Sequence, residues 1–83
     1  MRHLILYSTL GCHLCEQAKA LSEPVLADSG IALREVDIAD DDALMDVYGV
    51  RIPVLRDSAS NAELGWPFDA VELADWLNGL SKL

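Results

Sequence analysis

The sequence predicts a small α/β domain in which helices cover both faces of a four-stranded mixed sheet, in the element order βαβαββα. An apolar run at 4–7 and a segment of imperfect apolar–polar alternation at 31–38 have strand character, and they alternate with segments of helical periodicity, which is the pattern of a parallel strand–helix–strand unit. A hairpin pattern and a final amphipathic segment follow them. With 83 residues and a hydrophobic fraction of 52%, the chain has the length and composition of one domain, residues 1–83.

The N-terminal half of the pattern begins with a continuous apolar run at 4–7, which is typical of a central strand buried on both faces. A helix is expected from Leu14, and Pro24 should kink it or end it and start another turn, because the proline ring clashes with the carbonyl four residues earlier. Gly30 suits the end of this helical segment. The apolar stripe of the helix is expected to contain Leu14, Ala18, Leu21 and Val25.

A second strand at 31–38 should run parallel to the first, with the usual right-handed crossover. The aspartates 40–42 fit the cap and first turn of a second helix, where the helix dipole favours negative charge. A divalent-cation site is the rival interpretation, but adjacent residues on a helix point in different directions. The expected core face of this helix, which Gly49 ends, consists of Ala43, Leu44, Val47 and Tyr48, and both Tyr7 and Tyr48 are expected in the core.

The C-terminal half should contain a third strand at 50–56, although Pro53 lies inside that run and cannot donate to a sheet. Turn residues at 57–61 and a short strand at 62–64 complete a hairpin. Asp69 should begin the last helix, with Glu72 three residues later as in a capping box. The buried stripe of that helix is expected to contain Ala70, Leu73, Ala74, Leu77 and Leu80.

The chain carries 14 acidic and 6 basic side chains, for a net charge of −8. This balance argues against nucleic acid or an anionic membrane surface as a partner, and it favours either a basic protein partner or simple solubility. No apolar run approaches the roughly 18 residues of a membrane helix, and the N-terminal apolar stretch is too short for a signal peptide. We therefore expect a cytoplasmic monomer, in a compartment where paired cysteines tend to be catalytic or metal-binding.

Both cysteines of the chain, Cys12 and Cys15, lie between the first strand and the first helix. Cys12 should sit at the helix N-terminus and Cys15 one turn further on, close enough for a disulfide. A Cys-x-x-Cys in this context indicates thiol–disulfide chemistry. The alternative is a metal-bound or iron–sulfur-bound pair. A zinc site needs four ligands, and only His3 and His13 are available to complete it, so no metal site is predicted.

Taken together, the pattern resembles the glutaredoxin-like proteins of the thioredoxin fold over essentially the whole chain. The resemblance rests on Cys12–Cys15 after the first strand and on Arg51-Ile52-Pro53-Val54 after the second helix. It implies that Pro53 is cis and lies beside an active-site disulfide. It also implies that the amide and carbonyl of Ile52 face an incoming peptide or thiol.

The sequence departs from that family at three places. The residues between the cysteines are His13-Leu14, where glutaredoxins usually have a pair such as Pro-Tyr. Glutathione-binding members carry a basic residue shortly before the first cysteine, and residues 8–11 contain none. Asp69 occupies the position that would bind the γ-glutamyl end of glutathione, but Trp66-Pro67-Phe68 replaces the Gly-Gly step before it. These departures argue against glutathione as a substrate, and no resident cofactor is expected.

The predicted function is a small glutaredoxin-like oxidoreductase in electron transport and cell redox homeostasis, with Cys12 as its redox-active nucleophile. The helix N-terminus should lower the pKa of the Cys12 thiol, and a protonated His13 would lower it further. Cys15 would resolve the mixed disulfide formed with a protein substrate, and a reductase or thiol reductant would recycle the pair. Ile52, Pro53, Trp66 and Asp69 are the expected substrate-binding residues.

Two of these roles have a purely structural alternative, in which His13 is an exposed helix-start residue and Trp66 a packing lid. The alternative to catalysis is a redox-sensing or protein-interaction module without turnover.

Overall fold

The computed structural model describes residues 3–80, and in this range the order of elements is the βαβαββα order expected from the sequence. A single turn of 3-10 helix, η1, follows the second strand. The elements are β1 (His3–Ser8), α1 (His13–Asp28), β2 (Ala32–Asp37), η1 (Ile38–Asp40), α2 (Asp42–Tyr48), β3 (Val54–Asp57), β4 (Glu63–Gly65) and α3 (Ala70–Leu80).

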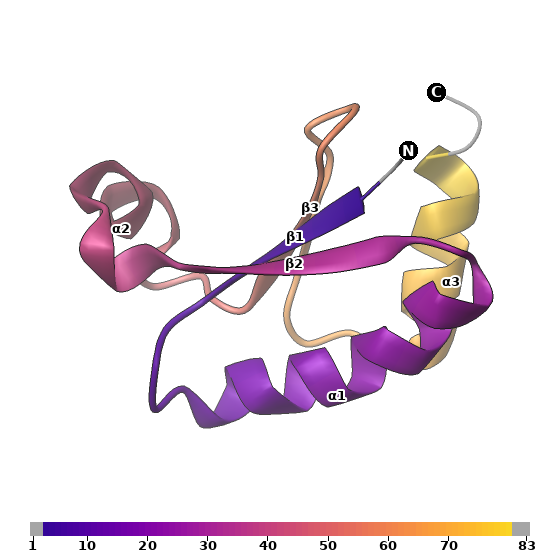
Figure 1. Ribbon diagram of the computed structural model, residues 1–83, viewed down its shortest axis with the longest axis horizontal. Helices are drawn as coiled ribbons and strands as arrows, with labels where there is room; N and C mark the ends of the chain where they lie inside the picture. The colour runs from indigo at the N-terminus through magenta and orange to yellow at the C-terminus, as the bar shows by residue number, and fades with distance from the viewer. Residues whose placement is uncertain (1–2, 81–83) are drawn as a thin grey trace.

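The four strands form one mixed sheet in the order β2-β1-β3-β4. Strand β1 is central: it runs parallel to β2 and antiparallel to β3, which in turn pairs with β4 as a hairpin. Figure 1 shows α1 and α3 next to each other, with α2 set well apart from both. The fold is therefore α/β with a mixed sheet, and it matches the architecture predicted from the sequence.

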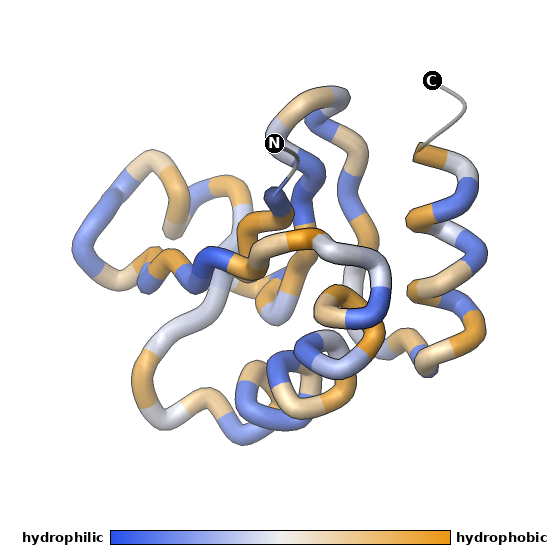
Figure 2. The backbone as a smooth tube through the Cα atoms, turned by 45° about the vertical axis from the view of Figure 1, so that its right-hand side comes forward, coloured by the Kyte–Doolittle hydropathy of each residue, from blue (hydrophilic) through white to orange (hydrophobic). Residues whose placement is uncertain are grey.

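The alternation of side chains along β1 divides the core between the two faces of the sheet. Leu4 and Leu6 are fully buried among side chains of α1 and α3, whereas Tyr7 packs against α2. Burial of a leucine side chain stabilises the fold by about 1.5–3 kcal/mol. Helix α3 supplies Leu73, Leu77 and Leu80 to the first face, and the alternation of hydrophobic and hydrophilic residues along it is visible in Figure 2.

Helix α1 buries a different stripe from the one expected. Leu14 is 48% exposed, because the helix is rotated so that Cys15 faces inward, where it reaches Cys12. Leu21 and Val25 are half-buried at the margin of the stripe. The buried residues of the helix are Cys15, Ala18, Ser22 and Leu26.

Pro24 does not end α1, which continues to Asp28. Proline removes one helical hydrogen bond, and the carbonyl that loses its donor belongs to Ala20. Both Pro24 and Ala20 are exposed, so water can satisfy that carbonyl. The cost of the proline is thus reduced by its position on the solvent side of the helix.

Helices α2 and α3 each bury a narrower face than predicted. In α2, Leu44 and Tyr48 face the sheet, while Ala43 and Val47 are exposed, Val47 to 52%. This helix has seven residues and contacts the sheet along a single i, i+4 ridge, so residues beside the ridge stay in solvent. In α3, Ala70 and Ala74 are likewise exposed.

The strands also differ from prediction at their ends. Strand β3 begins at Val54 and not at residue 50, because Pro53 has no N–H to donate to a neighbouring strand. Strand β4 is displaced by one residue from the predicted 62–64, and β2 is one residue shorter at each end than the predicted 31–38.

Within residues 3–80, none of the helices combines the length and apolar character needed to cross a membrane.

Candidate active site

The candidate site lies at the end of the sheet where β1 and β2 finish and β3 begins. The register pairs Ser8 with Asp37 across the parallel strands, and Tyr7 with Val54 across the antiparallel pair. If the antiparallel register is continued by one residue, Pro53 lies opposite Ser8, at the end of β1. The backbone N–H of Trp66 donates to the carbonyl of Pro53 at 3.1 Å. Asp37, Ser8, Pro53 and Trp66 thus form one row across the sheet, from β2 to the end of β4.

The disulfide stands at the end of the loop that leaves this row from β1. The loop turns at Gly11, whose positive φ of 76° suits glycine, and a hydrogen bond from the N–H of Cys12 to the carbonyl of Thr9 closes the turn at 3.3 Å. Cys12 occupies the N-cap position of α1 and is joined to Cys15 by a disulfide, with their Cα atoms 5.2 Å apart.

The two sulfurs have different surroundings. Cys15 is 2% exposed, whereas Cys12 is half-buried. The backbone N–H of Cys15 donates to Sγ of Cys12 at 3.2 Å, so an unpaired amide of the first helical turn is directed at the outer sulfur. The same amide would stabilise a thiolate at Cys12 after reduction.

His13 points along the helix surface, where its Nδ1 lies 3.9 Å from Oε2 of Glu16, with both side chains largely exposed. Its effect on Cys12 stays a prediction. His3 lies at the other end of β1, where its Nδ1 is 3.4 Å from Oγ of Ser58, so the fold does not bring the two histidines together. Among the described residues, no three His, Cys, Asp or Glu side chains are grouped as metal ligands would be.

The peptide bond between Ile52 and Pro53 is cis, as the family resemblance implies, and Pro53 is buried. The expectation that the amide of Ile52 faces a substrate is wrong, because this N–H already donates to the carbonyl of Tyr48 at 3.0 Å. The side chain of Ile52 is half-buried against the cluster around Tyr7 and Val54. The carbonyl of Ile52 accepts no backbone hydrogen bond within residues 3–80, so it can accept one from a partner.

Trp66 and Asp69 each have a structural role in addition to the predicted one. Trp66 is half-buried and makes an edge-to-face contact with Phe68, with ring centroids 5.1 Å apart. Asp69 forms the predicted capping box: its Oδ1 accepts from the N–H of Glu72 at 2.7 Å, and Oε1 of Glu72 accepts from the N–H of Asp69 at 3.3 Å. Substrate binding by either residue stays a prediction.

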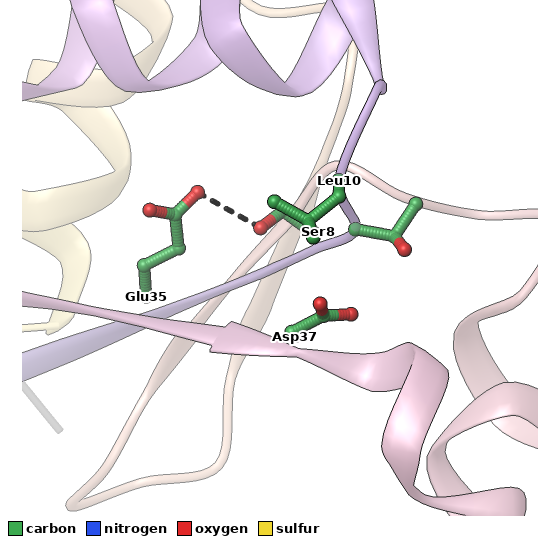
Figure 3. A pocket seen from close by; sticks show the side chains of 5 residues that line it. Ser8, Leu10, Glu35 and Asp37 are labelled. Carbon is green, nitrogen blue, oxygen red and sulfur yellow. Dashed lines mark hydrogen bonds between the residues drawn. The ribbon is translucent and has the colours of Figure 1, made fainter.

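On the other side of the disulfide lies a feature that the sequence analysis missed. A pocket of about 230 Å³ borders Cys12 and Cys15, and Glu16, Lys19 and Glu35 contribute charged groups to its wall. The carboxylate of Glu35 accepts from Oγ of Ser8 at 2.9 Å and from Nζ of Lys19 at 3.3 Å. Figure 3 shows the bond from Ser8 to Glu35, and Asp37 beyond it on the same strand.

A signal for this pocket was present in the sequence. Glu35 and Asp37 are two residues apart near the end of a predicted strand, so they share one face of it. In parallel strands the carboxyl ends meet at one edge of the sheet, which is also where Cys12 was expected. The two carboxylates could therefore have been assigned to the neighbourhood of the cysteines.

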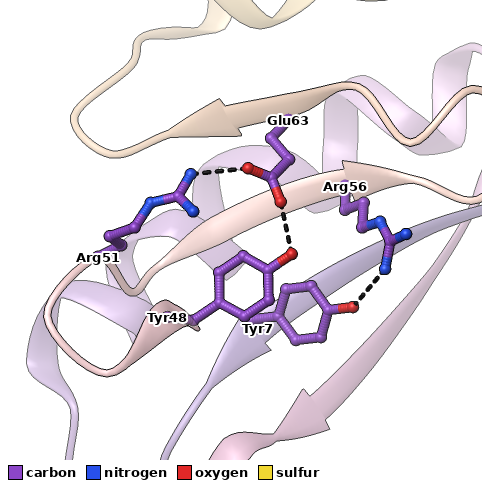
Figure 4. Close-up of polar contacts among 5 residues, drawn as sticks. All are labelled: Tyr7, Tyr48, Arg51, Arg56 and Glu63. Carbon is purple, nitrogen blue, oxygen red and sulfur yellow. Dashed lines mark hydrogen bonds and ion pairs between the residues drawn. The ribbon is translucent and has the colours of Figure 1, made fainter. Parts of the chain in front are cut away.

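A polar network ties α2 and the loop before β3 to the hairpin of β3 and β4. The rings of Tyr7 and Tyr48 stack with centroids 4.2 Å apart, and the hydroxyl of Tyr48 donates to Oε2 of Glu63. The guanidinium of Arg51 donates to Oε1 of the same carboxylate at 2.7 Å, and Arg56 donates to the hydroxyl of Tyr7 at 3.2 Å. Figure 4 shows these contacts.

The contacts of this network shift the pKa values of its side chains. Burial, followed by the hydrogen bond to Glu63, raises the pKa of Tyr48 to about 12. The hydrogen bonds from Tyr48 and Arg51 hold the pKa of Glu63 below its ordinary value. The hydrogen bond to Glu63 raises the pKa of Arg51, and that to Tyr7 raises the pKa of Arg56. The charges of this network therefore stay fixed over the physiological pH range.

Comparison with known proteins identifies a family and a fold. The family described as "Glutaredoxin-like domain (DUF836)" matches residues 3–78. The search of curated protein sequences found no match.

Three solved structures illustrate the likeness. The X-ray structure of target protein XcR50 from X. campestris is 45% identical, covering 92% of this chain and 96% of that one, with a TM-score of 0.77. Protein Ne2328 from Nitrosomonas europaea is 29% identical, covering 90% of this chain and 89% of that one, also with a TM-score of 0.77. A mutant thioredoxin from Halobacterium salinarum NRC-1 is 23% identical over 99% of this chain and 76% of that one. Its TM-score of 0.75 shows that the thioredoxin fold is shared.

Proposed function

This chain belongs to the glutaredoxin-like domain family, and on that premise we propose that it is a small thiol–disulfide oxidoreductase that reduces protein disulfides. The observation that supports this most directly is the asymmetry of the cysteine pair. Cys12 caps α1 and its Sγ accepts the N–H of Cys15, while Cys15 itself is 2% exposed. An accessible sulfur and a shielded one are what an attacking and a resolving thiol require.

In the reduced protein, Cys12 is the thiol with the lower pKa. The partial positive charge at the N-terminus of α1 and the N–H of Cys15 both favour a thiolate over a thiol at this position. A thiolate of lowered pKa is more populated at neutral pH and is also a better leaving group in exchange. Cys15 is only 2% exposed, and burial favours the neutral thiol over the charged thiolate.

The reaction proceeds by two exchanges. The Cys12 thiolate attacks one sulfur of the substrate disulfide, so that a Cys12–substrate bond forms, the substrate S–S bond breaks, and the departing thiolate takes up a proton. Cys15 then loses its proton and attacks Sγ of Cys12, which releases the second substrate thiol and leaves the Cys12–Cys15 disulfide. The substrate gains two electrons from this protein and two protons, one released by Cys15 and the other taken from solvent, because Cys12 reacts as the thiolate.

The apolar side of the site supplies the substrate contact. Pro53 and Trp66 lie in the row next to the loop that carries Cys12, and the carbonyl of Ile52 is available there to accept a hydrogen bond from an extended peptide. Recycling of the disulfide requires a thiol reductant or an NADPH-linked flavoprotein reductase. A reducing compartment such as the cytoplasm would keep the pair ready for the next cycle.

The test is reduction of insulin disulfides by the purified protein, with either glutathione or a flavoprotein reductase as the electron source. Wild type should turn over, and Cys12→Ser should lose turnover completely. The matched variant Cys15→Ser should stop after the first exchange and accumulate a mixed disulfide through Cys12, detectable by mass. Equal turnover in wild type and Cys12→Ser would overturn the proposal. Absence of turnover with both reductants, together with an ordinary Cys12 pKa, would favour an interaction module.

A further inference from the structure

The β2 side of the disulfide contains a groove that the proposed function leaves unused. A second pocket, of about 200 Å³, adjoins the one beside the cysteines, and the two share Thr9, Leu10 and Glu35 in their walls. The second pocket ends at Asp37. We call the two together the β2 groove. It leads from the cysteines to the last residue of β2, and it lies on the side of β1 opposite to Pro53 and Trp66.

The groove has a strong imbalance of charge. Its walls contain the carboxylates of Glu16, Glu35 and Asp37 and a single cation, Lys19. Lys19 is already paired with Glu35 at 3.3 Å, and both side chains are partly exposed. Oδ1 of Asp37 accepts from the N–H of Ala39 at 2.9 Å, and its Oδ2 has no partner among residues 3–80. The far end of the groove is therefore negative without a local counter-charge.

Apolar surface lies beside these carboxylates. The side chain of Leu10 is 90% exposed, and Figure 3 shows it together with Ser8, Glu35 and Asp37 around the pocket. An apolar wall that leads to a carboxylate matches a lysine or arginine side chain, whose methylene stem covers apolar surface while its charged end seeks an anion. A simple metal ion would gain nothing from the leucine.

The β2 groove lies where a side chain of the substrate would enter it while the substrate is bonded to Cys12. Because the first pocket borders Cys12 and Cys15, a substrate sulfur bonded to Cys12 would lie beside it. Because the second pocket shares part of its wall with the first, a neighbouring side chain of the same substrate would reach Asp37. The overall charge of −8 adds a long-range attraction of the same sign.

We infer that the β2 groove is a specificity site for a lysine or arginine that lies close to the reactive cysteine of the disulfide substrate. This inference rests on the proposed function and narrows it to one class of substrate, disulfides in a basic sequence context. Leu10 contacts the stem of the basic side chain, and Asp37, supported by Glu35, binds its charged end.

The experiment uses three peptide disulfides of identical sequence except for one residue next to the cysteine, which is lysine, alanine or glutamate. The rate constant for reduction of each by the reduced full-length protein is measured at low salt and at 1 M salt. The lysine peptide should react about five- to tenfold faster than the glutamate peptide at low salt. At 1 M, where the screening length falls to about 3 Å, most of that ratio should disappear.

Two variants locate the effect. Asp37→Asn keeps an oxygen that can accept from Ala39, so it removes charge and not the cap of η1, and it should lower the lysine-to-glutamate ratio about two- to fivefold. Asp75→Asn removes an equal charge from α3, none of whose residues lines the groove, and should leave the ratio and the alanine-peptide rate unchanged.

The outcomes separate the two proposals. Equal rates for the lysine and glutamate peptides in wild type, with the alanine peptide reduced normally, would overturn the groove assignment and leave the oxidoreductase intact. An equal loss of the ratio in Asp37→Asn and Asp75→Asn would also overturn it, because net charge alone would then explain the preference. No reduction of the alanine peptide would overturn the oxidoreductase and the groove together.

Discussion

The disulfide of this protein separates two flanks with different chemistry. On the β3–β4 side, Pro53 is fully buried and Trp66 is half-buried against Phe68 and the core cluster of α1 and α3. On the β2 side, Glu35 and Asp37 border an open groove with one paired lysine. The first flank is packed, whereas the second is an open groove lined by charged side chains. In our proposals, the first flank binds the substrate backbone and the second selects among substrates.

The largest loss of stability and of reduction rate is expected from a substitution on the apolar flank, at Trp66. Trp66→Ala removes the edge-to-face contact with Phe68 and part of the core below it, and should lower the free energy of unfolding by about 2 kcal/mol. It should also slow insulin reduction several-fold at low and high salt alike, since the lost contact is apolar. Urea unfolding and initial rates measure the two effects.

A conservative variant separates packing from substrate contact at this position. Trp66→Phe restores much of the apolar contact, so it should recover most of the stability and of the rate. A salt-dependent rate loss in Trp66→Ala would contradict the division between the flanks, because it would place electrostatic selection on the apolar side.

The next largest loss of stability is expected in the polar network around Glu63. Glu63→Gln weakens the hydrogen bonds that the carboxylate accepts from Tyr48 and Arg51, and should cost about 1–2 kcal/mol at pH 7. The folded-state pKa of Glu63 lies below its ordinary value of 4.5, so this stabilisation is present above that value and is lost as the pH falls through the lower folded value.

The measurement is the unfolding free energy of wild type and Glu63→Gln between pH 7 and pH 3, and the difference between them should shrink toward the acid end. Glu23→Gln, an exposed position on α1, serves as the control and should show little difference at any pH. A difference that stays constant from pH 7 to pH 3 would show that the charge of Glu63 contributes nothing.

The smallest change in stability is expected from a substitution in α1 at Ser22, away from both flanks. Ser22 is fully buried, and its hydroxyl has no hydrogen-bond partner among residues 3–80. Ser22→Ala removes a desolvated hydroxyl and improves helix propensity, so it should raise the unfolding free energy by about 1 kcal/mol and the melting temperature by about 4–8 °C. Insulin reduction should not change. A clear loss of stability would mean that the hydroxyl has a partner in solution.

The sequence predicted the parts of the site that depend on local chemistry. Cys12 could be placed at the helix start because a strand pattern, a glycine and a helical pattern meet there. Pro53 could be recognised because a proline inside an apolar run needs a special explanation. The capping box of Asp69 and Glu72 followed from spacing alone.

The parts that depend on strand pairing were not predicted. Glu35 becomes part of the site only through the parallel register of β1 and β2, which places it near Ser8. The amide of Ile52 was misjudged because its acceptor, the carbonyl of Tyr48, belongs to the end of α2. The exposure of Leu14 depends on how α1 is rotated about its axis. The apolar spacing in the sequence does not decide whether Leu14 or the next residue, Cys15, faces the core.

The central claim is that Cys12 is an activated nucleophile, and the pH dependence of its alkylation tests this most directly. The reduced protein is treated with iodoacetamide between pH 4 and pH 10, and the rate of modification at Cys12 is followed by peptide mass. We expect the rate to reach its half-maximum clearly below about pH 8.5, which is the ordinary pKa of a cysteine thiol. A midpoint at or above about 8.5 would contradict the account, because neither the helix N-terminus nor the N–H of Cys15 would then stabilise the thiolate.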